Sequence, residues 1–170
     1  MCQELAAEDE NQSNMPNTSS NTDFMHLALA QGRLALPECL PNPPVGCVLV
    51  KDNAVISQGH TQPPGFYHAE AMALSCLSRD CSGVSAFVTL EPCSFHGRTP
   101  SCALALIKSG VETVFVALLD PDPRNSGAGI KMLQDAGITV VVGLLAEEAA
   151  KDLADFLVRK PDGSSDHNDE

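Results

Sequence analysis

The second half of the chain alternates short apolar runs, rich in β-branched residues, with segments of helix-forming composition. The apolar runs are residues 85–90, 113–119 and 138–142, and the helical segments between them are residues 101–109 and 130–136. Strands that are joined by helices in this way lie parallel, with right-handed crossovers. The alternation therefore predicts an α/β fold in which the last three strands are parallel.

An antiparallel pair of strands is expected earlier in the chain. Residues 45–50 form an apolar run, residues 51–53 can form a tight turn, and residues 54–58 return as the second strand. Further helices are expected after a capping Asp23, at residues 68–74 and at residues 147–158. The sequence thus predicts a three-layer α/β/α sandwich on one mixed five-stranded sheet.

The net charge of −12 is concentrated at the two ends of the chain. Residues 1–23 carry five acidic residues and residues 161–170 carry four, and neither segment contains Lys or Arg. Because such polar segments bury little apolar surface, we expect disordered acidic tails at residues 1–22 and 161–170 and one folded domain at residues 23–160. The folded part is nearly neutral and lacks the basic surface that nucleic-acid binding requires.

The apolar runs and the cysteines indicate in which cellular compartment the protein works. The apolar runs are too short to span a bilayer, and the N-terminus has no basic start followed by an apolar stretch. We therefore expect a cytoplasmic protein with no membrane partner. The seven cysteines, an odd number, fit free thiols and a metal site better than a disulfide scaffold.

Three residues of metal-ligand type stand where elements begin or end. His68 opens a helix within His-Ala-Glu, Cys93 follows a strand within Glu-Pro-Cys, and Cys102 starts the next helix nine positions later. One imidazole and two thiolates make a three-ligand zinc set, which leaves a fourth tetrahedral position open for water. An open position is typical of catalytic zinc, and helix N-termini favour the thiolate form of cysteine.

Glu70 lies two positions after His68 and need not bind the metal. Beside a zinc-bound water it can accept a proton and later deliver one to the leaving ammonia. Each residue alone has a commoner interpretation: a surface or capping histidine, a core cysteine, a helix-opening carboxylate. Their occurrence together, in this order, matches the pattern of zinc deaminases and predicts a Zn²⁺-dependent hydrolytic deaminase.

Four segments resemble the riboflavin-biosynthesis pyrimidine deaminases, the diaminohydroxyphosphoribosylaminopyrimidine deaminases of the cytidine and deoxycytidylate deaminase-like superfamily. They are Asn42-Pro43-Pro44-Val45-Gly46, His68-Ala69-Glu70, Thr89-Leu90-Glu91-Pro92-Cys93-Ser94 and Gly97-Arg98-Thr99-Pro100-Ser101-Cys102. The resemblance covers about Phe24 to Arg159 and implies a cytidine-deaminase-like fold with zinc on His68, Cys93 and Cys102. It also implies hydrolytic loss of ammonia from 2,5-diamino-6-(5-phosphoribosylamino)pyrimidin-4-one. The substrate contacts it implies are Asn42, Arg98, Thr99, Asp120 and Asp122.

Residues around the expected substrate site depart from the family. Thr61 and Phe95 stand where the family usually has His, and Asp122 replaces an Asn. Ala128 replaces a basic residue, and Leu153 replaces an Asn in the last helix. Loss of two histidines and a basic group, with the gain of a carboxylate, should weaken binding of a phosphate.

These departures leave other functions open. The chain could be a divergent paralogue that deaminates another amino-heterocycle or nucleotide, or a non-catalytic zinc-binding partner protein, although Glu70 argues against the latter. The lack of a basic stripe disfavours a nucleic-acid editing deaminase.

The resemblance also implies a homo-oligomer. Because the NADPH-dependent reductase often fused to bacterial relatives is missing from these residues, we expect a separate reductase and no nicotinamide cofactor here.

Overall fold

The computed structural model of the protein describes residues 20–77, 80–95 and 100–157. The expected tails lie outside the described residues, apart from residues 20–22, which begin the first helix. In chain order the elements are α1 (Ser20–Leu34), β1 (Gly46–Lys51), β2 (Ala54–His60), α2 (Ala69–Ser75), β3 (Val84–Val88), α3 (Cys102–Ser109), β4 (Thr113–Val116), α4 (Ala128–Asp135), β5 (Thr139–Val142) and α5 (Ala146–Leu153).

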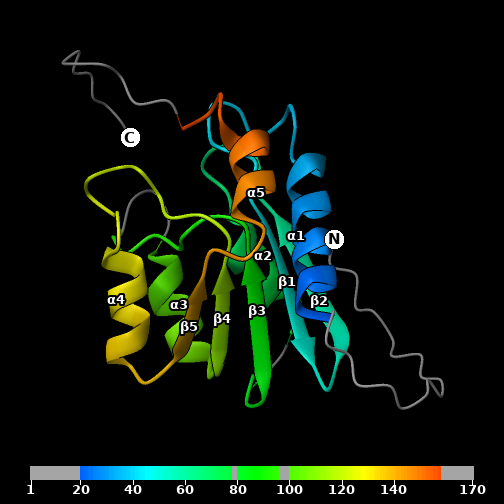
Figure 1. The fold of residues 1–170 in the computed structure, drawn as a ribbon, viewed down its shortest axis with the longest axis vertical. Coiled ribbons are helices and arrows are strands. Elements are labelled where there is room, and N and C mark those ends of the chain that lie inside the picture. Colours follow the sequence, from blue (N-terminus) through cyan, green and yellow to red (C-terminus); the bar gives the residue numbers. More distant parts are fainter. Residues whose placement is uncertain (1–19, 78–79, 96–99, 158–170) are drawn as a thin grey trace.

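The five strands form one sheet in the order β2-β1-β3-β4-β5 (Figure 1). β1 pairs antiparallel with both β2 and β3, whereas β3, β4 and β5 are parallel. The mixed five-stranded sheet and its three parallel strands confirm the predicted fold class. Since β3 and β4 run in the same direction, the segments that follow them leave the sheet at the same edge.

Helices cover both faces of the sheet and complete the three layers. On one face α1 packs against the strands and α5 against α1, and their buried cluster includes Met25, Ala28, Leu29, Val48, Val50, Phe87 and Ala149. On the other face α2, α3 and α4 pack through a cluster that includes Cys47, Leu49, Ala73, Ala86, Val88, Leu106, Val114 and Leu133. Neighbouring residues of β1 contribute to opposite clusters, as the alternation of side chains along a strand requires.

Local sequence explains two of the chain reversals. Asp52 and Asn53, between β1 and β2, have positive φ angles of 50° and 66°, which Asp and Asn adopt more readily than most residues and which suit a tight hairpin. Gly110 follows the last residue of α3 with a φ of 92°, a left-handed conformation that favours glycine at a helix end. At the other end of α3, the Ser101 hydroxyl accepts a hydrogen bond from the backbone N–H of Leu104.

Three helix boundaries differ from the sequence prediction. α1 begins at Ser20, so Asp23 does not cap the helix but lies in its first turn, where its charge still favours the helix dipole. α4 begins at Ala128, earlier than expected, because the Glu91 carboxylate satisfies backbone N–H groups at this end. α5 ends at Leu153, before the predicted residue 158, and a turn follows its buried side chain.

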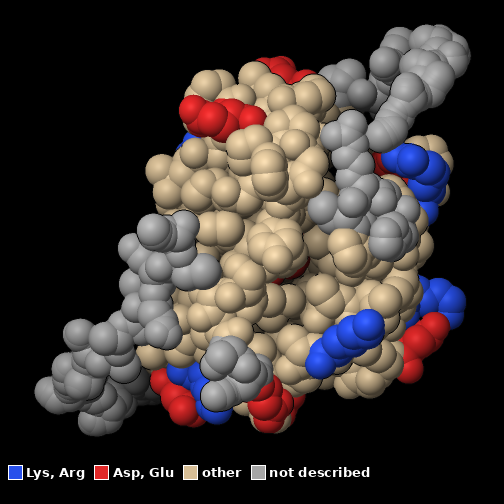
Figure 2. Space-filling view, turned by 180° about the vertical axis from the view of Figure 1, so that it is seen from behind, with Lys and Arg blue, Asp and Glu red and all other residues tan. Residues whose placement is uncertain are grey.

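The described surface is consistent with the charge distribution of the sequence. No helix within residues 20–77, 80–95 or 100–157 is both long and apolar enough to cross a bilayer. Figure 2 shows the side turned away in Figure 1, where uncharged atoms cover most of the coloured surface and charged side chains of both signs lie mainly toward its margins. The coloured residues of this face form no continuous basic stripe of the kind that binds a phosphate backbone.

Candidate functional site

The motifs singled out in the sequence meet at one edge of the sheet. Cys93 and Asp120 lie in the segments that follow the parallel strands β3 and β4. His68 is the N-cap residue of α2, and Cys102 is the first residue of α3. Two strand ends and two helix starts therefore supply the functional side chains.

The side chains of His68, Cys93 and Cys102 form a group that could hold a metal ion. Their ligand atoms all lie within 4.8 Å of one another. The Nδ1 atom of His68 faces both sulfurs, at 4.0 Å from Cys93 Sγ and 3.4 Å from Cys102 Sγ. With ordinary Zn–N and Zn–S bond lengths, nitrogen and sulfur ligands of a tetrahedral zinc lie about 3.6 Å apart. The donor set and its spacing therefore fit zinc, with His68 binding through Nδ1.

Contacts within this group favour a thiolate at one of the two cysteines. Cys93 Sγ accepts a hydrogen bond from the backbone N–H of Cys102 at 3.2 Å. The interaction with Cys102, assisted by His68, lowers the pKa of Cys93 against the opposing effect of burial. The same pairing, together with burial and the Glu70 carboxylate, raises the pKa of Cys102. Metal binding at neutral pH therefore requires loss of the Cys102 proton.

Glu70 lies in the first turn of α2 and is only 3% exposed. Burial, reinforced by the negative charge of Cys93, raises the pKa of Glu70 to about 7. Its carboxylate interacts with the Cys102 thiol, which places it beside the metal-binding group. A buried carboxyl with a pKa near neutrality can both accept and return a proton. We call His68, Glu70, Cys93 and Cys102 the metal end of the site.

Glu91 joins the end of β3 to the start of α4. Its carboxylate is buried and accepts four backbone hydrogen bonds, from Asp120 (3.1 Å), Gly127 (3.0 Å), Gly129 (2.9 Å) and Ile130 (3.2 Å). The last three donors lie at the N-terminus of α4, where backbone N–H groups lack intrahelical partners. In the sequence Glu91 stands out only as part of the Glu-Pro-Cys motif, and its contact with α4 could not be predicted because the partners are 29 to 39 positions away.

Gly129 allows α4 to approach the metal end closely. A Cβ atom at this position would lie 2.0 Å from the carbonyl oxygen of Pro92 and 3.2 Å from Glu91 Oε2. Any side chain at position 129 would therefore displace the segment that leads into Cys93.

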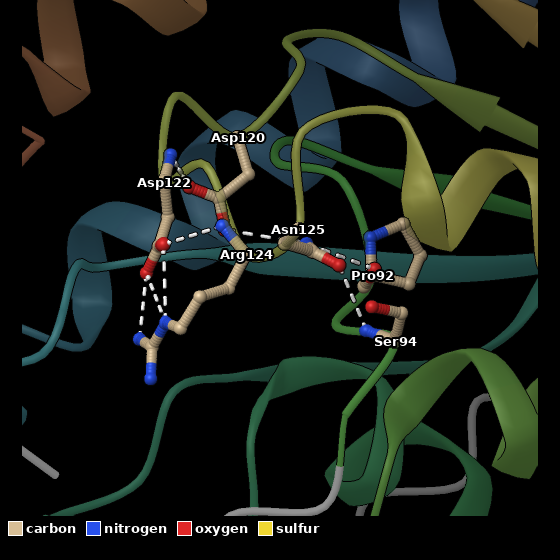
Figure 3. A network of polar contacts seen from close by, with 6 residues as sticks. All are labelled: Pro92, Ser94, Asp120, Asp122, Arg124 and Asn125. Atoms are coloured by element: carbon tan, nitrogen blue, oxygen red, sulfur yellow. Dashed lines mark hydrogen bonds and ion pairs between the residues drawn. The ribbon is translucent and has the colours of Figure 1, made fainter.

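Asn125 is fully buried between the segment that carries Cys93 and the Asp120 side chain (Figure 3). Its Oδ1 accepts a hydrogen bond from the backbone N–H of Ser94 at 2.9 Å. Its Nδ2 donates to the carbonyl oxygen of Pro92 and to Asp120 Oδ2, both at 3.3 Å. Sequence reasoning missed Asn125, since an Asn among Pro and Gly residues is an ordinary turn residue.

We call Phe95, Asp120, Asp122 and Arg124 the rim of the site. Asp120 is half-buried, burial raises its pKa, and its Oδ1 accepts a hydrogen bond from the backbone N–H of Asp122. The Asp122 carboxylate pairs with Arg124 at 2.6 Å, which lowers the pKa of Asp122. The Arg124 guanidinium also lies over the Phe95 ring, 4.7 Å from its centroid. Arg124 thus offsets the negative charge that Asp122 adds to the site.

Asn42 lies half-buried in the loop that enters β1. Thr61, which is 5% exposed, holds this loop: its hydroxyl donates to the carbonyl oxygen of Pro43 and accepts from the backbone N–H of Val45. Thr61 therefore has a structural role in this chain, because it ties the end of β2 to the loop that enters β1. The remaining predicted substrate contacts, Arg98 and Thr99, lie outside the described residues.

Comparison with known proteins finds relatives over the folded part of the chain. The family model of the cytidine and deoxycytidylate deaminase zinc-binding region matches residues 18–118, which contain the whole metal end. The riboflavin biosynthesis protein RibD of Haemophilus influenzae is 44% identical over 146 residues, covering 86% of this chain and 39% of the relative. RibD of Escherichia coli is 47% identical over 123 residues, covering 72% of this chain and 34% of the relative. The chain thus spans less than two fifths of the length of these curated relatives.

Solved structures show the same relationship. Acinetobacter baumannii RibD superposes with a TM-score of 0.79 at 42% identity, over 82% of this chain and 39% of that protein. A Thermotoga maritima diaminohydroxyphosphoribosylaminopyrimidine deaminase/5-amino-6-(5-phosphoribosylamino)uracil reductase gives a TM-score of 0.76 at 40% identity, over 81% of this chain and 40% of that protein. The dCMP deaminase of cyanophage S-TIM5, at 23% identity and a TM-score of 0.58 over 75% of this chain and 99% of that protein, shares the fold.

Proposed function

We propose that this chain, which belongs to the cytidine and deoxycytidylate deaminase family, is a zinc-dependent hydrolytic deaminase of riboflavin biosynthesis. Its substrate would be 2,5-diamino-6-(5-phosphoribosylamino)pyrimidin-4-one. The observation that carries the proposal is the buried Glu70 carboxylate beside three ligand atoms spaced for zinc. The choice of substrate is supported by the riboflavin-pathway relatives, which are 44% and 47% identical to this chain.

The metal end has the groups that the reaction needs. His68 Nδ1, Cys93 Sγ and Cys102 Sγ would hold the zinc and leave one position without a protein ligand. Zinc in such a site lowers the pKa of water and supplies a nucleophile at neutral pH. Glu70 accepts the proton from the attacking water and returns a proton to the departing amino group, which leaves as ammonia. A purely structural zinc site would have no use for this carboxylate.

The rest of the site would bind the pyrimidine and its ribosyl phosphate. In this proposal Asn42 holds the ring, and Asp120, Asp122, Arg98 and Thr99 contact the remainder of the substrate. Asp120 is the best supported of these by its position, because it lies in the segment after β4 and is tied through Asn125 to the segment that carries Cys93. The pairing of Asp122 with Arg124 limits the repulsion that Asp122 would exert on a phosphate.

The remaining expectations concern partners and location. We propose that the protein works in the cytoplasm as a homo-oligomer, without nucleic-acid or membrane partners.

The test is ammonia release from zinc-loaded protein, with the phosphorylated substrate and its dephosphorylated form assayed side by side. Turnover of the phosphorylated compound on the order of 1 s⁻¹ or more would support the riboflavin assignment. Turnover of the dephosphorylated compound or another aminopyrimidine alone would indicate a paralogue with a different substrate. Folded, zinc-loaded protein that deaminates none of them would favour a non-catalytic zinc protein.

A further inference from the structure

One buried side chain connects the two regions that the proposed reaction must align. Asn125 has no exposed surface, although it lies in the loop between β4 and α4. A buried amide is costly unless its donors and acceptor are all satisfied, and a buried polar group in a loop needs a specific reason.

The partners of Asn125 are the peptide groups on either side of a metal ligand. Oδ1 accepts from the N–H of Ser94, which follows Cys93, and Nδ2 donates to the carbonyl oxygen of Pro92, which precedes it. The same Nδ2 donates to Asp120 Oδ2 (Figure 3). The Asn125 amide is thus shared between the backbone around Cys93 and the carboxylate of Asp120.

We propose that Asn125 is a positioning residue that fixes Cys93 and the Asp120 carboxylate relative to each other, so that zinc binding and substrate binding both depend on it. The inference has two halves. The metal half, that zinc binding depends on Asn125, rests on the geometry of the ligand group. The substrate half, that substrate binding depends on Asn125, rests on the proposed function. Outer contacts that orient metal ligands are worth 10- to 100-fold in metal affinity or activity when they are removed.

An amide suits this role better than the other side chains of similar size. Leucine would neither accept from Ser94 nor donate to Pro92 and Asp120. Aspartate could still accept from Ser94, but it could not donate, and its charge would lie against the Asp120 carboxylate. Leucine therefore removes all three contacts, whereas aspartate keeps one of the two contacts around Cys93 and replaces the contact with Asp120 by a repulsion.

The experiment compares Asn125→Leu, Asn125→Asp and the control Ser57→Ala. Ser57 is also fully buried, and its hydroxyl donates to the carbonyl oxygen of Ala73 in α2 at 2.7 Å, so the control removes a buried hydrogen bond that involves neither Cys93 nor Asp120. For each variant, zinc affinity is measured by competition with a chromophoric chelator. The KM and kcat for the diaminopyrimidinone ribosylamino phosphate and the melting temperature are measured in parallel.

We expect Asn125→Leu to weaken zinc binding about 10- to 100-fold and to raise KM. Asn125→Asp should raise KM with a smaller loss of zinc affinity, and Ser57→Ala should lower the melting temperature without either change. The inference is overturned if Asn125→Leu changes zinc affinity and KM no more than Ser57→Ala does. If Asn125→Leu does not fold, an unchanged KM in Asn125→Asp overturns it. If the wild-type protein does not turn over the substrate, the proposed function has failed, and the zinc affinities of the variants still decide the metal half.

Discussion

The metal end and the rim are held in place by different kinds of contact. Glu70 is 3% exposed and Cys102 is 1% exposed, and both lie in the first turn of a helix that packs against the sheet. At the rim, the side chains of Asp122 and Arg124 are 31% and 65% exposed and are held largely by each other. A buried site keeps its geometry because water cannot compete for its polar groups, whereas exposed ion pairs contribute little and can rearrange. The metal end should therefore determine the chemistry, and the rim should adjust the choice of substrate.

The largest expected effect is at the metal end. Glu70→Gln removes the carboxylate to which we assign proton transfer in the proposed reaction but keeps its size, so kcat should fall about 10²- to 10⁴-fold. Because Glu70 is not one of the three ligands, the variant should still bind one zinc per chain. Ammonia release and metal analysis on the same sample test both statements. A variant that loses its zinc would show that Glu70 supports the metal and would remove the case for a catalytic role.

Gly129 tests whether close packing links α4 to the metal end. Alanine within a helix normally stabilises by about 1 kcal/mol relative to glycine. Here the Cβ would lie 2.0 Å from the Pro92 carbonyl oxygen, so Gly129→Ala should instead destabilise by about 3 kcal/mol and reduce zinc binding. Urea unfolding measures the change. Gly137→Ala is the control, because its φ of 92° is unfavourable for alanine but no atom lies within 4 Å of the added Cβ, and it should cost about 1 kcal/mol without affecting zinc.

The protonation of Cys102 makes zinc binding depend on pH. Its pKa is raised, so the metal-free protein holds a thiol that must lose its proton to the solvent when zinc binds. Zinc affinity should therefore rise roughly tenfold per pH unit for each proton released, as long as pH stays below the Cys102 pKa. Calorimetric titrations in buffers with different protonation enthalpies count the protons. A count of zero would mean that both cysteines are already thiolates before the metal arrives.

The smallest effect is expected at the rim. Arg124→Met removes the ion pair with Asp122 and the contact with Phe95, and should cost about 0.5 kcal/mol of stability while raising KM more than it lowers kcat. Pairing with Arg124 lowers the pKa of Asp122. The stabilisation of the fold by this ion pair is therefore present at neutral pH and is lost as pH falls below about 4. Thermal unfolding should show a larger destabilisation of the variant relative to the wild type at pH 7 than at pH 3. An effect on kcat as large as that of Glu70→Gln would contradict the division between metal end and rim.

The metal end could be predicted from the sequence because its information is local. His68 and Cys102 stand at helix starts and Cys93 follows a strand, and the neighbouring residues are enough to recognise each of these positions. The parallel direction of β3, β4 and β5 could be predicted for a similar reason, since strands joined by single helices run in the same direction.

The supporting contacts could not be predicted in this way. Glu91 binds backbone groups 29 to 39 positions away, and Asn125 binds the backbone of Pro92 and Ser94, 33 and 31 positions away. Nothing in the local sequence around Glu91 or Asn125 identifies these distant partners. The earlier start of α4 follows from the same Glu91 contact. Arg124 was a different case, because it lies only two residues from Asp122 and could have been weighed as its partner. The structure shows that this pairing is made, so the added carboxylate of Asp122 lies beside a guanidinium.

X-ray absorption at the zinc edge, on protein purified with zinc, tests most directly whether the metal end is an open catalytic site. We expect one zinc per chain with one imidazole nitrogen, two sulfur ligands and one oxygen that does not come from the protein. A fourth ligand from the protein, or no zinc bound to folded protein, would contradict the assignment of His68, Cys93, Cys102 and Glu70 to a hydrolytic deaminase.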